Sequence, residues 1–567
     1  MRGNKGTSRR ASPAARRAAP ASGAGLRRLR TPFAQRRAKK IPAASWPVMA
    51  ALFVALAWPA AYLVFQYREL HTSGIVLKPD APVFYSDQFI TFTLAARNPV
   101  TRAKLVREGL PPVYILRDGQ PVATIGGLRA ARVSYDPVEQ VWRGRFPCPW
   151  KPHPGEYSFS VPFKGKLADE FHADTFTIGR RSQAPVKKGF VALTLEYAGW
   201  HGALKLRTPD GQPSDWRAIP QWARYLGADA VWVLAGRSSF AGGRTWDPVD
   251  TATLKKLGAE CHRNGLQFGV WVMSYMTQPM GADKSSRYKW SWSSEQGGLM
   301  ETKGISLSDP QRPADIAAFL APFSRMPEVD FLGLDYIRNA IGGYEMADDF
   351  YRDMDWVSKP KGWETLDAKG RARAFAAMKI FGKDKDLVDA WQWWRAHKAA
   401  GVVRFVRGRL GGGKTYWAFT LGWEKGWQHG QDPVMMRDAG IDADAVMLYE
   451  ADKGQYASMM KDWGAYLDKG DLQLLAGDIV DTPLHQGGGS AEYKRRLEWA
   501  ASDIYGGAPA DGLFIHDLMR LLRGRLAPEN TQSWAQAVRQ TVESYKAMVG
   551  GRKSSAPARG ALLQPTE

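Results

Sequence analysis

The sequence has 567 residues, of which 44% are hydrophobic and 24% charged, so most of the chain can bury a core and global disorder is excluded. This length suggests roughly two to four domains. The formal net charge is +22, but 13 Lys and Arg residues, with no Asp or Glu, fall within residues 1–44. The basic excess therefore mostly describes an N-terminal tail, and we expect no nucleic-acid partner.

Residues 1–44 are rich in Arg, Ala, Ser, Gly and Pro, a composition that predicts a disordered tail. The next stretch, Trp46 to Phe65, runs for 20 residues without a charge. A helix of that length crosses about 30 Å of hydrocarbon, and lipid-embedded helices tolerate a proline such as Pro59. We predict a single transmembrane helix over residues 45–67.

The basic tail outweighs Arg68, which follows the apolar stretch, and this predicts a cytoplasmic N-terminus and an exported body. The protein would then be a single-pass protein of a bacterial inner membrane, with the lipid bilayer as a partner and its body periplasmic or extracellular. A cleaved signal peptide is the alternative. Its charged region would be unusually long, and no clear A-x-A cleavage site follows.

Residues 75–180 contain short segments in which apolar and polar residues alternate, for example 89–94 and 154–161. Six or seven such strands in about 100 residues predict an immunoglobulin-like β-sandwich. A spacer role and sugar binding are the two interpretations of this region. Cys148 and Cys261 fall in different predicted domains, so neither a disulfide framework nor a cysteine metal site is supported.

From residue 187 to 550 short β-rich runs alternate with amphipathic helices, which predicts parallel βα units. Eight strands in this length favour an α/β fold of the (β/α)8 TIM-barrel type, with residues 551–567 as a second disordered tail. A doubly wound sheet is the alternative, but no Gly-rich phosphate loop follows the first strand. The predicted strands are 190–197, 230–235, 267–275, 330–335, 416–420, 445–450, 472–476 and 512–515.

Residues Gly408 to Thr415 fit the phosphate-loop pattern GxxxxGK[ST]. Such a loop leaves a buried strand and opens a helix. Here a helical pattern precedes the glycines and a strand-like run follows Thr415, so we interpret them as a helix stop and tight turn. An ATPase would instead require a helix after Lys414.

The segment "SDPQRPADIAAFL…EVDFLGLDYIRN" resembles the bacterial glycosyl-hydrolase-like TIM-barrel proteins, through Asp309, Pro310 and Pro313 and through the run Asp335–Arg338. Two further segments, "WQWWRAHKAAGVVRFVRGRL" and "MMRDAGIDADAVMLYEAD", are similar to the helix before the fifth strand and to the sixth-strand unit of that family. The resemblance covers about residues 187–520. It implies a barrel fold and glycosidic chemistry.

Glycoside cleavage uses two carboxyl groups that flank the scissile bond. Asp335, at the end of the fourth strand, is the predicted nucleophile because Arg338 would keep it ionised. Glu450, which ends the sixth strand in an apolar run, is the predicted general acid, by analogy with retaining sugar hydrolases. The alternatives are a structural ion pair for Asp335, a cap or substrate contact for Glu450, and Asp517, Asp478 or Glu196 as the acid.

The chain has 23 Trp residues, and aromatic faces that line a groove suit a polysaccharide. Core packing is the competing explanation for tryptophans inside strands. The predicted substrate-binding residues lie at strand ends, inside strands or in the loops beyond them, and they are Glu196, Tyr197, Trp232, Trp271, Tyr275, Tyr336, Arg338, His429, Tyr449, Asp478 and Asp517.

Two functions follow from these patterns. The first is a membrane-anchored, exported glycoside hydrolase that acts on a cell-surface or secreted polysaccharide. The second is a non-catalytic protein that binds a polysaccharide during its export or assembly. We expect no cofactor and no metal, because His429, His485 and His516 lack metal-ligand spacing.

Overall fold

The structure is a computed structural model that describes residues 46–71, 75–123, 125–161, 174–196, 206–238, 245–248, 250–277, 287–294, 298–339, 342–380, 384–421, 425–426, 429–448, 452–480, 489–523 and 530–551. The chain divides into two compact units, Met1–Arg68 and Glu69–Glu567. The predicted tails lie outside the described residues, except for Gly551, which ends a helix.

Helix α1 (Trp46–His71) covers the stretch that the sequence marks as a membrane span, and Pro59 lies inside it. Within the part of the chain that the structure describes, no helix combines the length and apolar character needed to cross a membrane. The predicted transmembrane span is therefore not found.

Eight parallel strands of the second unit form a closed barrel. Each strand pairs in parallel with both of its neighbours, and the pairing of β13 with β15 closes the ring. Every strand overlaps one of the predicted strands, which confirms the (β/α)8 prediction. The strands are β10 (Phe190–Leu195), β13 (Ala230–Ser238), β15 (Gln267–Thr277), β18 (Phe331–Asp335), β19 (Thr415–Thr420), β20 (Ala443–Met447), β21 (Leu474–Ile479) and β22 (Gly512–His516).

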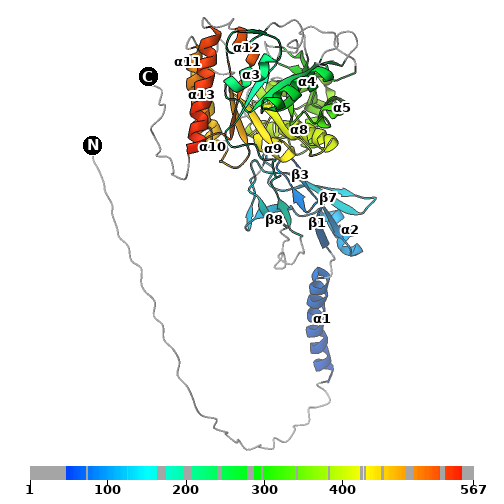
Figure 1. The fold of residues 1–567 in the computed structure, drawn as a ribbon. Helices are drawn as coiled ribbons and strands as arrows, with labels where there is room; N and C mark the ends of the chain where they lie inside the picture. Colours follow the sequence, from blue (N-terminus) through cyan, green and yellow to red (C-terminus); the bar gives the residue numbers. More distant parts are fainter. Residues whose placement is uncertain are drawn as a thin grey trace, which may run out of the picture. The chain divides into compact units, whose positions relative to one another are not determined.

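Helices follow the barrel strands in chain order and cover the outside of the barrel (Figure 1). Several begin at an aspartate whose side chain accepts a hydrogen bond from a backbone N–H of the first turn, as Asp384 does from Leu387. The helices are α3 (Ala218–Tyr225), α4 (Thr251–Arg263), α5 (Arg312–Ser324), α8 (Lys385–Leu410), α9 (Pro433–Ala439), α10 (Lys453–Tyr466), α11 (Gly489–Asp503), α12 (Leu518–Arg523) and α13 (Thr531–Gly551).

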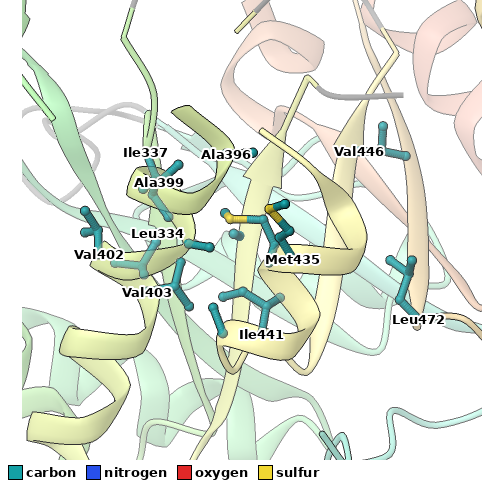
Figure 2. Packing of buried hydrophobic residues seen from close by; sticks show 14 of the residues in the cluster. Leu334, Ile337, Ala396, Ala399, Val402, Val403, Met435, Ile441, Val446 and Leu472 are labelled. Atoms are coloured by element: carbon teal, nitrogen blue, oxygen red, sulfur yellow. The ribbon is translucent and has the colours of Figure 1, made fainter. Parts of the chain in front are cut away.

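The layer between strands and helices is apolar. Figure 2 shows Val402 and Val403 of α8 beside Leu334 of β18, and Met435 of α9 close to Ile441. All five side chains are buried. Removal of this surface from water is the main force that holds the helices on the barrel.

The barrel interior is filled mostly by aromatic rings. The rings of Trp232 and Trp417 stack with centroids 3.9 Å apart, and Trp271 meets Trp417 edge-on at 5.8 Å. Trp232 and Trp271 are fully buried, so the substrate-stacking role predicted for them is wrong and core packing is their role. Gly333 makes room for this packing, because a Cβ atom there would lie 2.3 Å from the Trp417 ring.

Shorter elements extend the barrel unit between its main strands. Strands β16 and β17 form an antiparallel hairpin after β15, and β14 pairs with the end of β13. These elements are β11 (Leu206–Arg207), β12 (Pro213–Ser214), β14 (Trp246–Pro248), β16 (Trp290–Ser293), β17 (Met300–Ile305), η4 (Tyr344–Met346), α6 (Ala347–Asp353), η5 (Trp363–Thr365) and α7 (Ala368–Ile380).

Residues 75–178, here called the sheet module, contain two β-sheets that pack together through Phe92 of one and Phe159 of the other, whose rings lie 4.9 Å apart. The immunoglobulin-like topology stays a prediction. One sheet has the strand order β1 (Ile75–Pro79), β3 (Phe89–Ala96), β7 (Val141–Pro147), β6 (Arg132–Asp136), and the other β2 (Val83–Phe84), β9 (Phe176–Ile178), β8 (Gly155–Ser160), β4 (Tyr114–Arg117), β5 (Gln120–Pro121), with helix α2 (Pro99–Glu108) after β3.

The sheet module packs against helices α8 and α9 of the barrel. The indole N–H of Trp393 donates to the carbonyl of Cys148 at 2.7 Å, and the Ser86 hydroxyl donates to the carboxylate of Asp438 at 2.6 Å. Asp438 and Trp393 are fully buried. The sheet module is therefore joined to the barrel by a desolvated interface.

The phosphate-loop-like segment has the inverted context that its sequence predicts. Helix α8 ends at Leu410, and strand β19 begins at Thr415, directly after Lys414. The Lys414 ammonium donates to the carbonyl of Met326 at 2.9 Å. A strand after Lys414 is incompatible with a phosphate loop, which would open a helix there.

Candidate active site

Alternation along the strands places three ionisable side chains at one end of the barrel interior. Ala192 of β10 and Phe514 of β22 belong to the interior cluster, so Glu196 and His516, an even number of residues further on, lie on the same side. Asp335 is the last residue of β18 and lies four residues after Phe331, another member of the interior cluster, so it also lies on the interior side. Because all eight strands are parallel, these C-terminal ends meet at one face, where barrel enzymes place their chemistry.

His516 lies between a hydroxyl and a carboxylate. Its Nε2 atom is 3.1 Å from Oε2 of Glu196, and its Nδ1 atom is 3.1 Å from the hydroxyl oxygen of Thr194. The Thr194 hydroxyl also donates to the carbonyl of Ile515 at 3.1 Å. Thr194 is fully buried, whereas Glu196 keeps 33% of its side chain exposed, so the carboxylate is the part of this group that a substrate can reach.

Asp517 fixes the backbone beside Glu196. Its carboxylate accepts hydrogen bonds from the backbone N–H of Glu196 and from that of Arg520, each at 2.9 Å. Burial raises the pKa of Asp517, while the nearby His516 opposes this. Asp517 thus connects the end of β10 to the start of α12.

The carboxyl of Asp335 is almost completely buried, at 6% exposed, and accepts a hydrogen bond from the backbone N–H of Tyr336 at 2.7 Å. Burial raises the pKa of Asp335 to about 7, and the charge of Glu196 adds to this, although Arg338 and His516 lower it. Desolvation therefore outweighs the attraction of Arg338, in contrast to the expectation that Arg338 keeps Asp335 ionised.

Tyr336 adopts a left-handed backbone conformation, with φ of 52°, which is rare for an aromatic residue and is the kind of strain found at functional sites. The Arg338 guanidinium lies over its ring at 4.7 Å from the centroid. The Nη1 atom of Arg338 is buried and has no hydrogen-bond partner among the described residues.

Glu196 and Asp335 have opposite pKa shifts. Burial of the Glu196 carboxyl works towards a higher pKa, but the hydrogen bond from His516 and the charges of His516, Arg520 and Arg237 lower its pKa below the usual value. One carboxyl at this face therefore stays ionised at neutral pH, whereas the other holds a proton for much of the time.

The structure does not bring every predicted site residue to this face. Asp478 faces outward from β21 and pairs with Arg496, and Tyr275 is fully buried, its hydroxyl without a hydrogen-bond partner among the described residues. His429 is partly exposed in a segment after β19. Three predicted residues, Tyr197, Tyr449 and Glu450, lie outside the described residues.

Sequence reasoning did not single out Thr194, and it noted His516 at a strand end without including it among the predicted site residues. Both carry a usable signal, because each lies two residues beyond an interior position of its strand, Ala192 and Phe514. The alternation that places Glu196 therefore also places its two partners.

The carboxyl of Glu345 holds the hairpin β16–β17. It accepts hydrogen bonds from the Ser306 hydroxyl and from the backbone N–H of Trp292, both at 2.6 Å, and its Oε1 lies 3.3 Å from the Asn339 amide nitrogen. Burial raises the pKa of Glu345 to about 7. Asn339 follows Asp335 by four residues, so Glu345 connects the hairpin to the loop after β18.

In the described ranges, no three His, Cys, Asp or Glu side chains come together as a metal ion would require. No family model matches the sequence, and no curated protein does. Among solved structures, the C-terminal domain of ChiA from Legionella pneumophila is similar over 65% of this chain and 100% of that chain, with 10% identity and a TM-score of 0.32. A likeness at that TM-score carries no argument, so the barrel assignment rests on the strand pairing.

Proposed function

We propose that the protein is a glycoside hydrolase that cleaves a polysaccharide at the C-terminal face of its barrel. One observation carries the proposal. Two carboxyl groups, Asp335 and Glu196, lie in one charged cluster, and their surroundings shift their pKa values in opposite directions. Such a pair supplies a proton donor and an ionised partner at the same pH, as glycoside cleavage requires.

The roles follow from the protonation states. Asp335, with a pKa of about 7, is the general acid that protonates the leaving oxygen. Glu196, which is ionised and partly exposed, is the nucleophile or the base that activates water. Glu450 stays a candidate for the second carboxyl, as the sequence predicts. The resemblance to glycosyl-hydrolase-like barrels supports the same class of reaction.

Non-catalytic polysaccharide binding is the second candidate. The ion pair between Glu196 and His516 favours this candidate. A carboxylate whose charge is balanced by a histidine can accept hydrogen bonds from sugar hydroxyl groups without taking part in a reaction. In that case the protein would retain a polysaccharide without shortening it.

The test is incubation of the purified full-length protein with a panel of neutral and acidic polysaccharides, with product release as the measurement. We expect Asp335→Asn and Glu196→Gln each to lower the rate by about 100-fold or more. Asp118→Asn, in a turn where the side chain is 88% exposed, is the matched control and should leave the rate unchanged. Retention of polysaccharide without product release would support binding, and an unchanged rate in Asp335→Asn would remove Asp335 from the mechanism.

We propose membrane attachment on the uncharged sequence from Trp46 to Phe65 alone, and export on the charge asymmetry around it. Alkaline extraction of bacterial membranes should leave the protein in the membrane fraction, and protease added to spheroplasts should degrade the barrel. Release of the protein by alkali, or protection of the barrel, would contradict the proposal.

A further inference from the structure

The geometry points to His516 as a positioning residue, a doubly protonated imidazolium clamped between Thr194 and Glu196 that holds the Glu196 carboxylate ionised and oriented. The inference deepens the proposed function, because it explains how Glu196 is kept ready as a base or nucleophile. Its first part, the charge state of His516, does not depend on which reaction the site performs.

A count of hydrogens around His516 leads to this assignment. The carbonyl oxygen of Ile515 can only accept, and it lies 3.1 Å from the Thr194 hydroxyl oxygen, so we assign the single hydroxyl hydrogen of Thr194 to this bond. With that assignment the Thr194 oxygen presents a lone pair to Nδ1 of His516, 3.1 Å away, and Nδ1 carries the hydrogen. On the other side of the ring, Nε2 faces a carboxylate at 3.1 Å and donates to it. Both ring nitrogens are then protonated.

The proton between Nε2 and the carboxylate belongs to the histidine. Burial disfavours charge on both groups, but their mutual hydrogen bond and attraction lower the pKa of Glu196 and raise the pKa of His516. The hydrogen bond to a charged partner is also the stronger kind, which fixes the direction of the carboxylate. The second oxygen of Glu196 stays available to a substrate.

The groups that face His516 come from several elements. Asp517, next to it in the chain, raises its pKa, and Arg520 of α12 lowers it. Asp335 of β18 interacts with its charge, and the ring of Phe419 of β19 meets the imidazole edge-on, with centroids 6.3 Å apart. Glu196 provides the largest favourable contribution, so the imidazolium and the carboxylate stabilise each other.

The experiment is a titration of the histidine ring nitrogens by ¹⁵N NMR in the full-length protein, with the His516 signals assigned by their loss in His516→Gln. At pH 7.5 we expect both nitrogens of His516 to show protonated shifts, at a pH where an ordinary histidine is mostly neutral. Thr194→Val keeps the side-chain shape but removes the acceptor, so the titration midpoint should fall by about one pH unit. Thr194→Ser should keep the midpoint of the natural protein.

Glu196→Gln provides a second variant, with a larger expected fall in the midpoint, if Thr194→Val does not fold. A neutral His516 at pH 7.5, or a midpoint that neither substitution lowers, would overturn the inference. These titrations use no substrate, so they can succeed even if no polysaccharide is cleaved. Where cleavage is measured, His516→Gln should move the acidic limb of the pH–rate profile upward, and an unmoved limb would remove the positioning role.

Discussion

The Nε atom of Arg496 lies 3.0 Å from a carboxylate oxygen of Asp478, and both side chains are buried, at 1% and 0% exposed. Asp478 belongs to β21 and Arg496 to α11, so this ion pair joins the barrel to its helix layer. The Arg496 guanidinium also lies over the ring of Tyr456, 4.3 Å from its centroid. Asp478 therefore holds helix α11 on the barrel. It does not contribute to the substrate-binding face, contrary to what its position near a strand end predicts.

Asp478→Asn should lower the free energy of unfolding by about 3–5 kcal/mol, because it removes a buried negative charge that balances the buried Arg496 guanidinium. Urea unfolding measures the change. Joint replacement, Asp478→Leu with Arg496→Met, should cost less than the single change because no charge remains uncompensated. Unchanged stability with a large loss of polysaccharide cleavage would instead return Asp478 to the site.

Gly333→Ala should destabilise the barrel by about 1–3 kcal/mol, because its Cβ atom would lie 2.3 Å from ring carbons of Trp417, whose neighbours leave it no space to move. The matched control is Gly412→Ala, in the turn between α8 and β19, where a Cβ meets nothing within 4 Å. The control should stay within about 0.5 kcal/mol of the natural protein in urea unfolding. Equal stability of the two variants would contradict the packing described for Trp417.

The interface between the sheet module and the barrel offers a buried and an exposed ion pair for comparison. Asp438 accepts hydrogen bonds from Arg180 at 3.0 Å and from Ser86, and its side chain is fully buried. Asp438→Ala should cost about 3–5 kcal/mol, since Arg180, 12% exposed, loses its partner.

Arg132→Ala breaks the pair of Arg132 with Asp355, which lies at 3.2 Å with 54% and 41% of the side chains exposed. This control should cost less than about 1 kcal/mol. Thermal unfolding measures the stability of both variants, and limited proteolysis between residues 179 and 189 measures how readily the sheet module separates from the barrel. If both lost the same stability, burial would not be the deciding factor at this interface.

The raised pKa of Asp444 makes the stability of the protein depend on pH. It lies on the outer side of β20, and burial raises its pKa to about 7, against about 4 for an unfolded chain. The folded state binds more protons between these values, so the stability contributed by Asp444 is full below pH 4 and is lost as the pH rises to 7.

Asp444→Asn removes this titration. The fall in unfolding free energy between pH 5 and pH 8 should become smaller by about 2 kcal/mol in the variant. Guanidinium unfolding at the two pH values measures the difference, with the exposed Asp118→Asn as a control that keeps the natural slope. A slope unchanged in Asp444→Asn would contradict the raised pKa.

Much of the fold was predictable because its signals are local. Strand alternation and helix patterns identified all eight barrel strands, and the glycines before Lys414 were recognised as a turn because a helix precedes them. The ends of β10, β18 and β22 marked Glu196, Asp335 and Asp517 as candidates. The same alternation would have assigned Asp478 to the outer face of β21, since Leu475 and Gly477 face the interior.

The sequence by itself determined the order of βα units and the carboxyl groups at the strand ends, because both depend on residues close together in the chain. Only the tertiary structure decided how deeply these carboxyl groups are buried, which side chains they contact and whether they are ionised. Glu196 and Asp517 are 321 positions apart, and only the closure of β10 against β22 brings them together. The same closure desolvates Asp335 and places His516 beside Glu196, so the two carboxyls differ in proton affinity because of neighbours that no local pattern reveals.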